Sequence, residues 1–180
     1  SRQIIDALFS TITNANFDDE ALKMRIDKAL SMKNELIGTA KKRSIGLPSL
    51  PEVAFHPAPD RYESAAERVG VLSMENEDIR SLKQMVVYGV KGAAAYTEHA
   101  LNLGFADPDI FAMIENALAE VYRPDIDADA LTALVLNVGE CGVKAMALLD
   151  KANTTTYGNP EITKVNIGVG KNPGILVSGH

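Results

Sequence analysis

The stretch ANTTTYGNPEITKVNIGVGKNPGILVSGH, residues 152–180, marks the point where the chain changes from helical to extended sequence patterns. Before it, apolar residues mostly recur every three or four positions, as they do on one face of an α-helix. Within it, residues 165–169 alternate between apolar and polar or small side chains, and residues 175–177 form a short apolar run. Turn-forming residues at 171–174 separate the two. We therefore predict β-strands after a mainly helical body.

The first seventy residues predict a partial helical bundle followed by a proline-rich linker. Residues 1–14 and about 17–43 have helical spacing and are expected to form an antiparallel pair around residues 14–16, with Asp18 after Phe17 as a helix cap. Four prolines fall within residues 46–60, which favours a loop, and a short helix is expected near residues 61–69. The expected inner face of the second helix carries Leu22, Ile26, Leu30, Leu36 and Ile37.

Residues 71–151 predict an up-down-up three-helix bundle. Apolar stripes run through residues 76–103 and 127–149, and Asp107 before Pro108 is typical of a helix cap followed by proline at the first helical position. Short connections at residues 104–106 and 124–126 require neighbouring helices to run antiparallel. The predicted fold class is mainly α: a helical pair and a three-helix bundle, with residues 152–180 as a linker and the first strands of a truncated α/β domain.

Composition argues against two classes of partner. The chain has 180 residues, a net charge of -6 and no basic block, whereas nucleic-acid binding requires clustered cations. The densest cationic stretch, residues 41–43, suits a solvated helix C-terminus. No uninterrupted apolar run approaches the roughly twenty residues that span a bilayer, so no membrane segment is expected.

Several residues that suggest chemistry have simpler interpretations. The glycine-rich residues 168–174 fit neither a phosphate-binding loop nor a dinucleotide fingerprint, because the lysine is followed by Asn172 and Pro173 replaces the third glycine. Cys141 is the only cysteine, so a packing role is favoured over a ligand role. His99 and His56 lack partners at metal-site spacing, and a surface or packed histidine is the favoured interpretation.

Specific stretches of the sequence resemble one known family. They are residues 153–160 (NTTTYGNP), 165–180 (VNIGVGKNPGILVSGH), 88–100 (YGVKGAAAYTEHA), 144–150 (KAMALLD) and 9–18 (FSTITNANFD). Together they resemble the hybrid cluster proteins, also called prismane proteins or hydroxylamine reductases. The resemblance covers nearly the whole chain and is weakest in residues 41–70.

The resemblance implies an iron-sulfur oxidoreductase. Members of the family hold a conventional iron-sulfur cluster near the N-terminus and a hybrid iron-sulfur-oxygen cluster, reduce hydroxylamine to ammonia and water, and have nitric oxide as a proposed substrate. The Ser-Gly-His motif at residues 178–180 matches the family motif whose histidine ligates the hybrid cluster, so His180 is the implied metal and cofactor ligand. Iron-sulfur chemistry also suggests a cytoplasmic location. The electron donor protein is not indicated.

The family's N-terminal cysteines and later cluster ligands have no counterpart in the chain, so we expect an internal fragment whose partner is the remainder of the parent polypeptide. We expect this piece alone to be inactive and to hold no cluster. An alternative is a free-standing helical interaction module without redox activity. A third possibility is the related carbon monoxide dehydrogenase architecture, although no equivalent of the Thr-Tyr-Gly-Asn-Pro run at residues 156–160 is known there.

Overall fold

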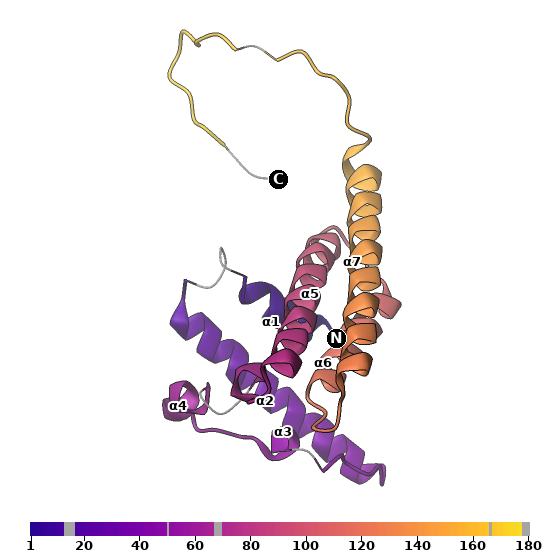
Figure 1. The fold of residues 1–180 in the computed structure, drawn as a ribbon. Helices are drawn as coiled ribbons and strands as arrows, with labels where there is room; N and C mark the ends of the chain where they lie inside the picture. Colours follow the sequence, from indigo (N-terminus) through magenta and orange to yellow (C-terminus); the bar gives the residue numbers. More distant parts are fainter. Residues whose placement is uncertain (13–16, 50, 67–69, 166, 178–180) are drawn as a thin grey trace.

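The computed structural model describes residues 1–12, 17–49, 51–66, 70–165 and 167–177, and these residues are mainly helical (Figure 1). The longer helices are α1 (Arg2–Ser10), α2 (Asp19–Lys42), α5 (Glu77–Asn102), α6 (Pro108–Val121) and α7 (Ala128–Tyr157). Shorter turns of helix lie between α2 and α5: α3 (Pro51–Ala54), η1 (Pro59–Arg61), α4 (Tyr62–Ala66) and η2 (Val71–Ser73). The prediction of a mainly α fold is confirmed.

The helices α5, α6 and α7 form the predicted up-down-up arrangement, with α5 and α7 side by side along most of α5 (Figure 1). Each begins at a residue whose side chain accepts a backbone hydrogen bond: Asn76 from Ile79, Asp107 from Asp109 and Asp127 from Ala130. Such caps satisfy amide groups that have no partner within the helix. The sequence therefore located the starts of these helices correctly.

The core lies where α5, α6 and α7 meet, and α1 contributes to it. Its buried side chains include Val86 and Val90 of α5, Ile110 and Ile114 of α6, and Cys141 of α7. Ile5 of α1 joins this cluster, because α1 packs more extensively on α5 than on α2. Lys91 of α5 also donates a 3.0 Å hydrogen bond to the carbonyl oxygen of Thr11, just past α1. The first helix is thus attached to the bundle.

Helix α2 lies outside this core. Asp18 caps it as predicted, since its carboxylate accepts from the amide of Ala21 at 3.0 Å. The prediction that one face of α2 is buried is wrong, because α2 has no buried residue and Leu36 is 68% exposed. An apolar face becomes buried only where another surface packs against it, and the described residues cover α2 only in part. The expected turn at residues 14–16 lies outside the described residues.

The proline-rich segment runs beside α2 and is held there by polar contacts. Lys33 of α2 donates a hydrogen bond to the carbonyl oxygen of Phe55, and Tyr62 donates one to the Asp27 carboxylate. The hydrogen bond to Asp27 raises the pKa of the Tyr62 phenol. The short helix predicted near residues 61–69 is confirmed for the described part, where α4 spans Tyr62–Ala66. The predicted loop at residues 46–60 is interrupted by the helical turns α3 and η1.

Helix α7 is, among the described helices, the one long and apolar enough to cross a membrane by length and composition alone. The sequence pattern did not indicate this because Asn137, Glu140 and Lys144 interrupt its apolar residues. Core helices of soluble proteins have the same properties. In the structure, Val138 and Cys141 of α7 belong to the buried core shared with α5 and α6.

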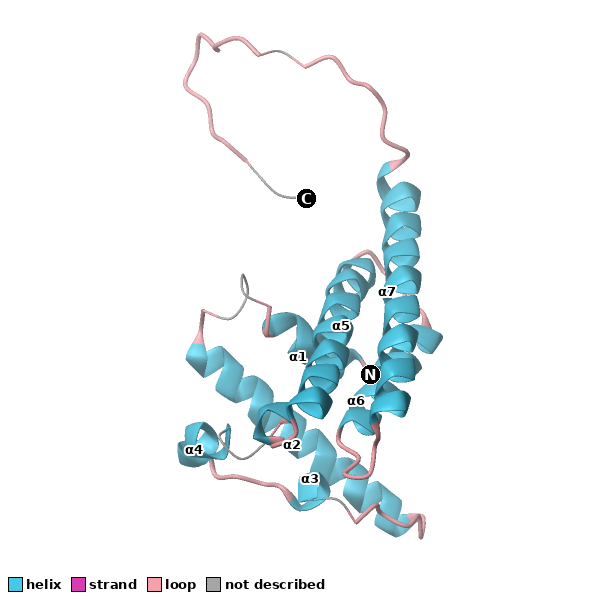
Figure 2. Cartoon of the chain, viewed as in Figure 1, coloured by secondary structure: helices cyan, strands magenta, loops and turns pink. Residues whose placement is uncertain are grey.

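The segment after α7 is extended, and its described residues contain no strand (Figure 2). The predicted strands at residues 165–169 and 175–177 are therefore absent from the described part of the segment. A strand satisfies its amide and carbonyl groups only by pairing with a neighbour, and none of the described residues provides one. The alternation of apolar residues thus indicated a tendency to form strands, but the described residues provide no neighbouring strand to pair with.

Candidate functional site

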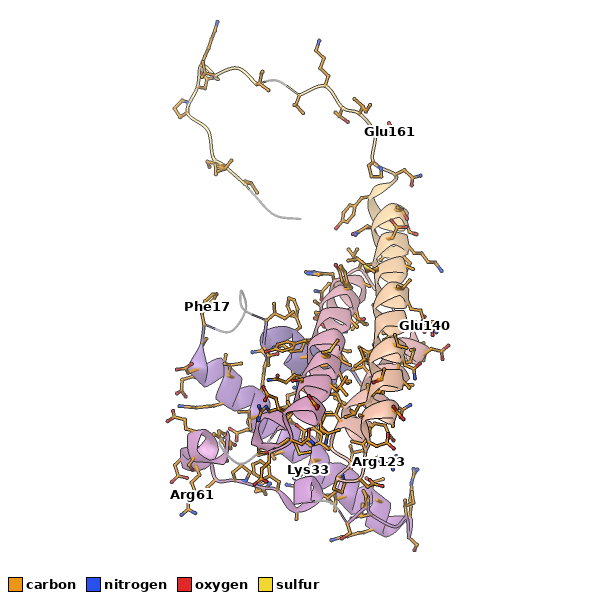
Figure 3. The ribbon with its side chains drawn as sticks, in the orientation of Figure 1. Phe17, Lys33, Arg61, Arg123, Glu140 and Glu161 are labelled. Atoms are coloured by element: carbon orange, nitrogen blue, oxygen red, sulfur yellow. The ribbon has the colours of Figure 1, made fainter. Side chains whose placement is uncertain are left out.

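The segment that leads to the predicted ligand begins at the glycine that ends α7. Helix α7 ends at Tyr157, and Gly158 adopts a φ of 83°, a left-handed conformation that glycine reaches without strain. Figure 3 shows Glu161 just beyond this end of α7, far from Arg123 at the opposite end of the helices. His180, the predicted metal and cofactor ligand, lies outside the described residues.

The described part of this segment is strongly exposed and apolar. Its solvent-exposed large side chains are Ile162, Val165, Ile167, Val169, Ile175, Leu176 and Val177. Exposed apolar surface of this extent is typical of a segment that is covered by another part of a protein. This property is independent of any role of His180.

No group of three or more His, Cys, Asp or Glu side chains that could hold a metal ion occurs within the described residues. His99 lies at the end of α5 with its ring edge against Phe9, with 5.6 Å between ring centroids. His56 is exposed in the proline-rich segment, where its Nδ1 lies 3.4 Å from the side-chain Nδ2 of Asn34. Both positions agree with the surface interpretation of these histidines.

Cys141 lies in the core of the bundle, as the packing interpretation predicted. It is buried on α7 among Val90, Ala117 and Val138. Burial raises the pKa of the Cys141 thiol, because the thiolate would lose hydration that the apolar surroundings do not replace. A thiol in this state is a poor nucleophile and a poor metal ligand at neutral pH.

An ion-pair network closes the turn between α6 and α7. Arg123 contacts the Asp125 carboxylate through Nε at 3.3 Å and Nη2 at 3.0 Å, and its Nη1 lies 2.9 Å from Glu120. The two-point contact with Arg123 lowers the pKa of the Asp125 carboxyl. The backbone carbonyl of Arg123 accepts a hydrogen bond from the buried Lys83 of α5 at 3.3 Å. These contacts fix the turn and provide no open coordination site.

The ends of α5 and α7 enclose a groove that sequence reasoning missed. It has a volume of about 690 Å³ and is lined by His99, Asn102, Leu103, Leu149, Asn153 and Tyr157. The lining residues come from two stretches that are far apart in sequence, so no local motif could indicate them. The regular spacing of Leu149, Asn153 and Tyr157 on one face of α7 was the available signal.

With this geometry in view, comparison with known proteins defines the class to which the chain belongs. The family model described as the Prismane/CO dehydrogenase family matches residues 1–180. The chain is a member of that family. The resemblance drawn from the sequence is therefore confirmed, including its extent over nearly the whole chain.

The similar relatives are named hydroxylamine reductase. The chain is 52% identical to the one from Porphyromonas gingivalis over 99% of its length, and 54% identical to the one from Parabacteroides distasonis over 98%. It is 53% identical to the one from Bacteroides fragilis, again over 98%. The match covers 32%, 33% and 32% of these relatives, so the chain spans about a third of their length. These names give no support to the alternative of an interaction module.

Proposed function

We propose that this chain is the helical part of a hybrid-cluster oxidoreductase that reduces hydroxylamine, with His180 as one ligand of its cluster. The observation that carries the proposal is the family match over residues 1–180 together with relatives named hydroxylamine reductase at about half identity. Because the chain covers about a third of those relatives, the remainder of a longer polypeptide is the expected partner.

The proposed reaction cleaves the N–O bond of hydroxylamine. Hydroxylamine takes up two electrons and two protons and yields ammonia and water, so nitrogen is reduced and an external electron donor protein is oxidised. Nitric oxide is the second substrate that the resemblance implies. In this scheme the described helices are structural, since none of their titratable side chains gathers with others into a metal-binding group.

The potential cluster ligands within the chain fit a role in which it supplies a single ligand. Four-iron clusters need about four thiolates. The chain has one cysteine, Cys141, whose side chain is buried in the helical core. An imidazole such as that of His180 is a good ligand for iron, and the other ligands of both clusters would come from the rest of the polypeptide. When bound, the clusters would supply the electrons.

The same proposal includes a cytoplasmic location, without nucleic-acid or membrane partners. It is supported by the net charge of -6 and by the single cysteine, which excludes a disulfide within the chain. Helix α7 packs against α5 and α6 through buried residues such as Val138 and Cys141, which supports its assignment to the helical bundle. Fractionation of cells that express the full-length protein would test the location.

Replacement of His180 in the full-length protein tests the central assignment. In the variant His180→Ala, iron content and the electron paramagnetic resonance signal of the hybrid cluster should fall, and hydroxylamine reduction should be lost. The control is His56→Ala, since His56 is exposed and its Nδ1 lies 3.4 Å from the side-chain nitrogen of Asn34. It should keep both the cluster and the activity. A full cluster signal with full activity in His180→Ala would refute the assignment.

A further inference from the structure

A second groove, which we call the glycine groove, lies along the line of contact between α5 and α7. It has a volume of about 320 Å³ and is lined from Met85 to Tyr96 on α5 and from Val135 to Met146 on α7. On each helix the last of these residues follows the first by eleven positions, which is about 16 Å or three helical turns. Because α5 and α7 run side by side (Figure 1), the glycine groove is elongated along both helices.

The glycine groove is apolar, and its walls are exposed to solvent. Among the described residues that line it, none carries a charge, although 23% of the residues of the chain are charged. The side chains of Met85, Tyr96 and Met146 are 55%, 42% and 45% exposed. Apolar side chains gathered around a depression are typical of a surface that binds another apolar element.

Three glycines that line this groove are not explained by contacts within the described residues. A Cβ atom at Gly92, Gly139 or Gly142 would meet nothing within 4 Å, so no described neighbour requires a residue without a side chain there. Glycine is less favourable than alanine in the interior of a helix, and all three positions lie well inside α5 or α7. The space above them is open to an element that approaches both helices closely.

The shape and chemistry of the glycine groove favour a helix as its occupant. A second copy of the same groove is a poor partner, because a two-fold interface requires a self-complementary surface, and two hollow surfaces leave empty space between them. A small ligand needs polar groups that fix its orientation, and Tyr96 supplies the single polar side chain among the described lining residues. An apolar α-helix is convex, and about three of its turns match the length of the groove.

We infer that a helix from the remainder of the polypeptide packs into the glycine groove. The chain spans about a third of the relatives that it matches, so about two thirds of such a polypeptide lies outside residues 1–180. Covalent attachment keeps that part at a high effective concentration beside the groove, which favours it over a separate protein. The inference rests on the longer polypeptide of the proposed function and is independent of its cluster and its reaction.

Methionine oxidation measures whether the glycine groove is covered, because a covered thioether reacts more slowly than an exposed one. Met85 and Met146 should oxidise several-fold more slowly in the full-length protein than in the 180-residue chain, as measured by mass spectrometry. Cys141 is the internal control for folding, since it is buried in the helical core and should react slowly with iodoacetamide in both. Equal oxidation rates in the two proteins would overturn the inference. Oxidation of the 180-residue chain that slows as its concentration rises would also overturn it, because a second copy would then occupy the groove.

A larger side chain inside the groove tests the position of the covering helix. In the full-length variant Gly142→Leu, the leucine fills part of the groove, and Met85 should oxidise at the rate found in the 180-residue chain. Gly38→Leu in α2 is the matched control, because a Cβ atom there also meets nothing within 4 Å and Gly38 does not line the groove. Met85 should stay protected in this control.

The same substitution in the 180-residue chain shows whether the bundle itself accepts it. Gly142→Leu should leave the helical circular dichroism of that chain unchanged, since its Cβ atom meets no described neighbour. Met85 that stays protected in full-length Gly142→Leu would overturn the inference, because the covering segment would then lie outside the groove. Protected methionines in a full-length protein that does not reduce hydroxylamine would refute the proposed function and leave this inference intact.

Discussion

Gly89 of α5 faces Val138 of α7 so closely that a Cβ atom at position 89 would lie 2.5 Å from the Val138 Cγ1. Carbon atoms at van der Waals contact are about 3.5–4.0 Å apart, so a side chain at position 89 fits only if the Val138 side chain or one of the two helices moves. This contact lies between α5 and α7, which pack together more extensively than any other pair of described helices.

Gly89→Ala should therefore destabilise the bundle, although alanine is the better helix former. Overpacking of this kind costs about 1–3 kcal/mol, which exceeds the helix-propensity gain of about 1 kcal/mol. Gly92→Ala is the matched control, because a Cβ atom there meets nothing within 4 Å. It should leave the free energy of unfolding unchanged or raise it slightly. Urea denaturation of both variants measures the difference, and equal midpoints would contradict the interpretation of the contact.

The turn between α6 and α7 predicts a pH dependence. Arg123 lowers the pKa of Asp125 in the folded state, so the carboxylate contributes stability above the ordinary aspartate pKa of about 3.9. That contribution is lost as the pH falls through the lower folded-state value. The stability difference between the native chain and Asp125→Asn should thus be constant at neutral pH and shrink below about pH 4.

Nuclear magnetic resonance titration of the Asp125 carboxyl tests the cause directly. In Arg123→Gln the pKa of Asp125 should rise toward the ordinary value, because the guanidinium contact is its largest cause. The matched variant Lys144→Gln should leave Asp125 unchanged and instead raise the pKa of Glu140, which Lys144 lowers. An unchanged Asp125 titration in Arg123→Gln would show that Arg123 is not responsible. Both contacts are exposed and should weaken in high salt.

The buried thiol predicts slow chemical modification. In the native chain, Cys141 should react with iodoacetamide much more slowly than a free thiol, because burial both blocks access and raises its pKa. Val143→Cys, combined with Cys141→Ala, provides the comparison, since Val143 is 62% exposed on the same helix. Denaturant should abolish the difference between the two positions. Equal rates in the folded chains, followed by mass spectrometry, would disprove burial of the thiol.

Cluster reconstitution tests whether the side chains of this chain alone can hold an iron-sulfur cluster. The 180-residue chain has one cysteine, and its described residues include no group of side chains that could hold a metal ion. We expect anaerobic incubation with iron and sulfide to yield no stoichiometric cluster, and we expect the chain alone to show no hydroxylamine reduction. Iron and acid-labile sulfide analysis after desalting measures the first outcome. A cluster that survives desalting in the His180→Ala chain would refute the expectation that the chain has too few ligands to hold a cluster. It would also refute the role of His180 as a ligand.

The bundle was predictable because its signals are local. Helical spacing and the caps Asn76, Asp107 and Asp127 determine where α5, α6 and α7 begin, and these side chains accept the expected hydrogen bonds. The end of α7 was harder to predict from the sequence. Thr154–Thr156 disfavour a helix by propensity, yet the helix continues to Tyr157, with the Thr154 hydroxyl donating to the Asp150 carbonyl oxygen at 2.8 Å.

Long-range features were not predictable from spacing. The contact between Lys91 and the carbonyl of Thr11 joins residues 80 positions apart, and it attaches α1 to α5. The exposed face of α2 and the unpaired segment after α7 were missed for one reason: periodicity shows which side chains would be buried, whereas the presence of a covering surface depends on the rest of the fold. The assignment of His180 rested on the family resemblance and stays a prediction.

The thirty residues of α7 also act as a lever. At 1.5 Å per residue the helix is about 45 Å long, so a tilt of about 5° near its base would swing its far end by about 4 Å. A change of helix spacing at the contact between Gly89 and Val138 would therefore be magnified at the far end of α7. The position of the segment that follows Tyr157 therefore depends on a helix contact several turns away.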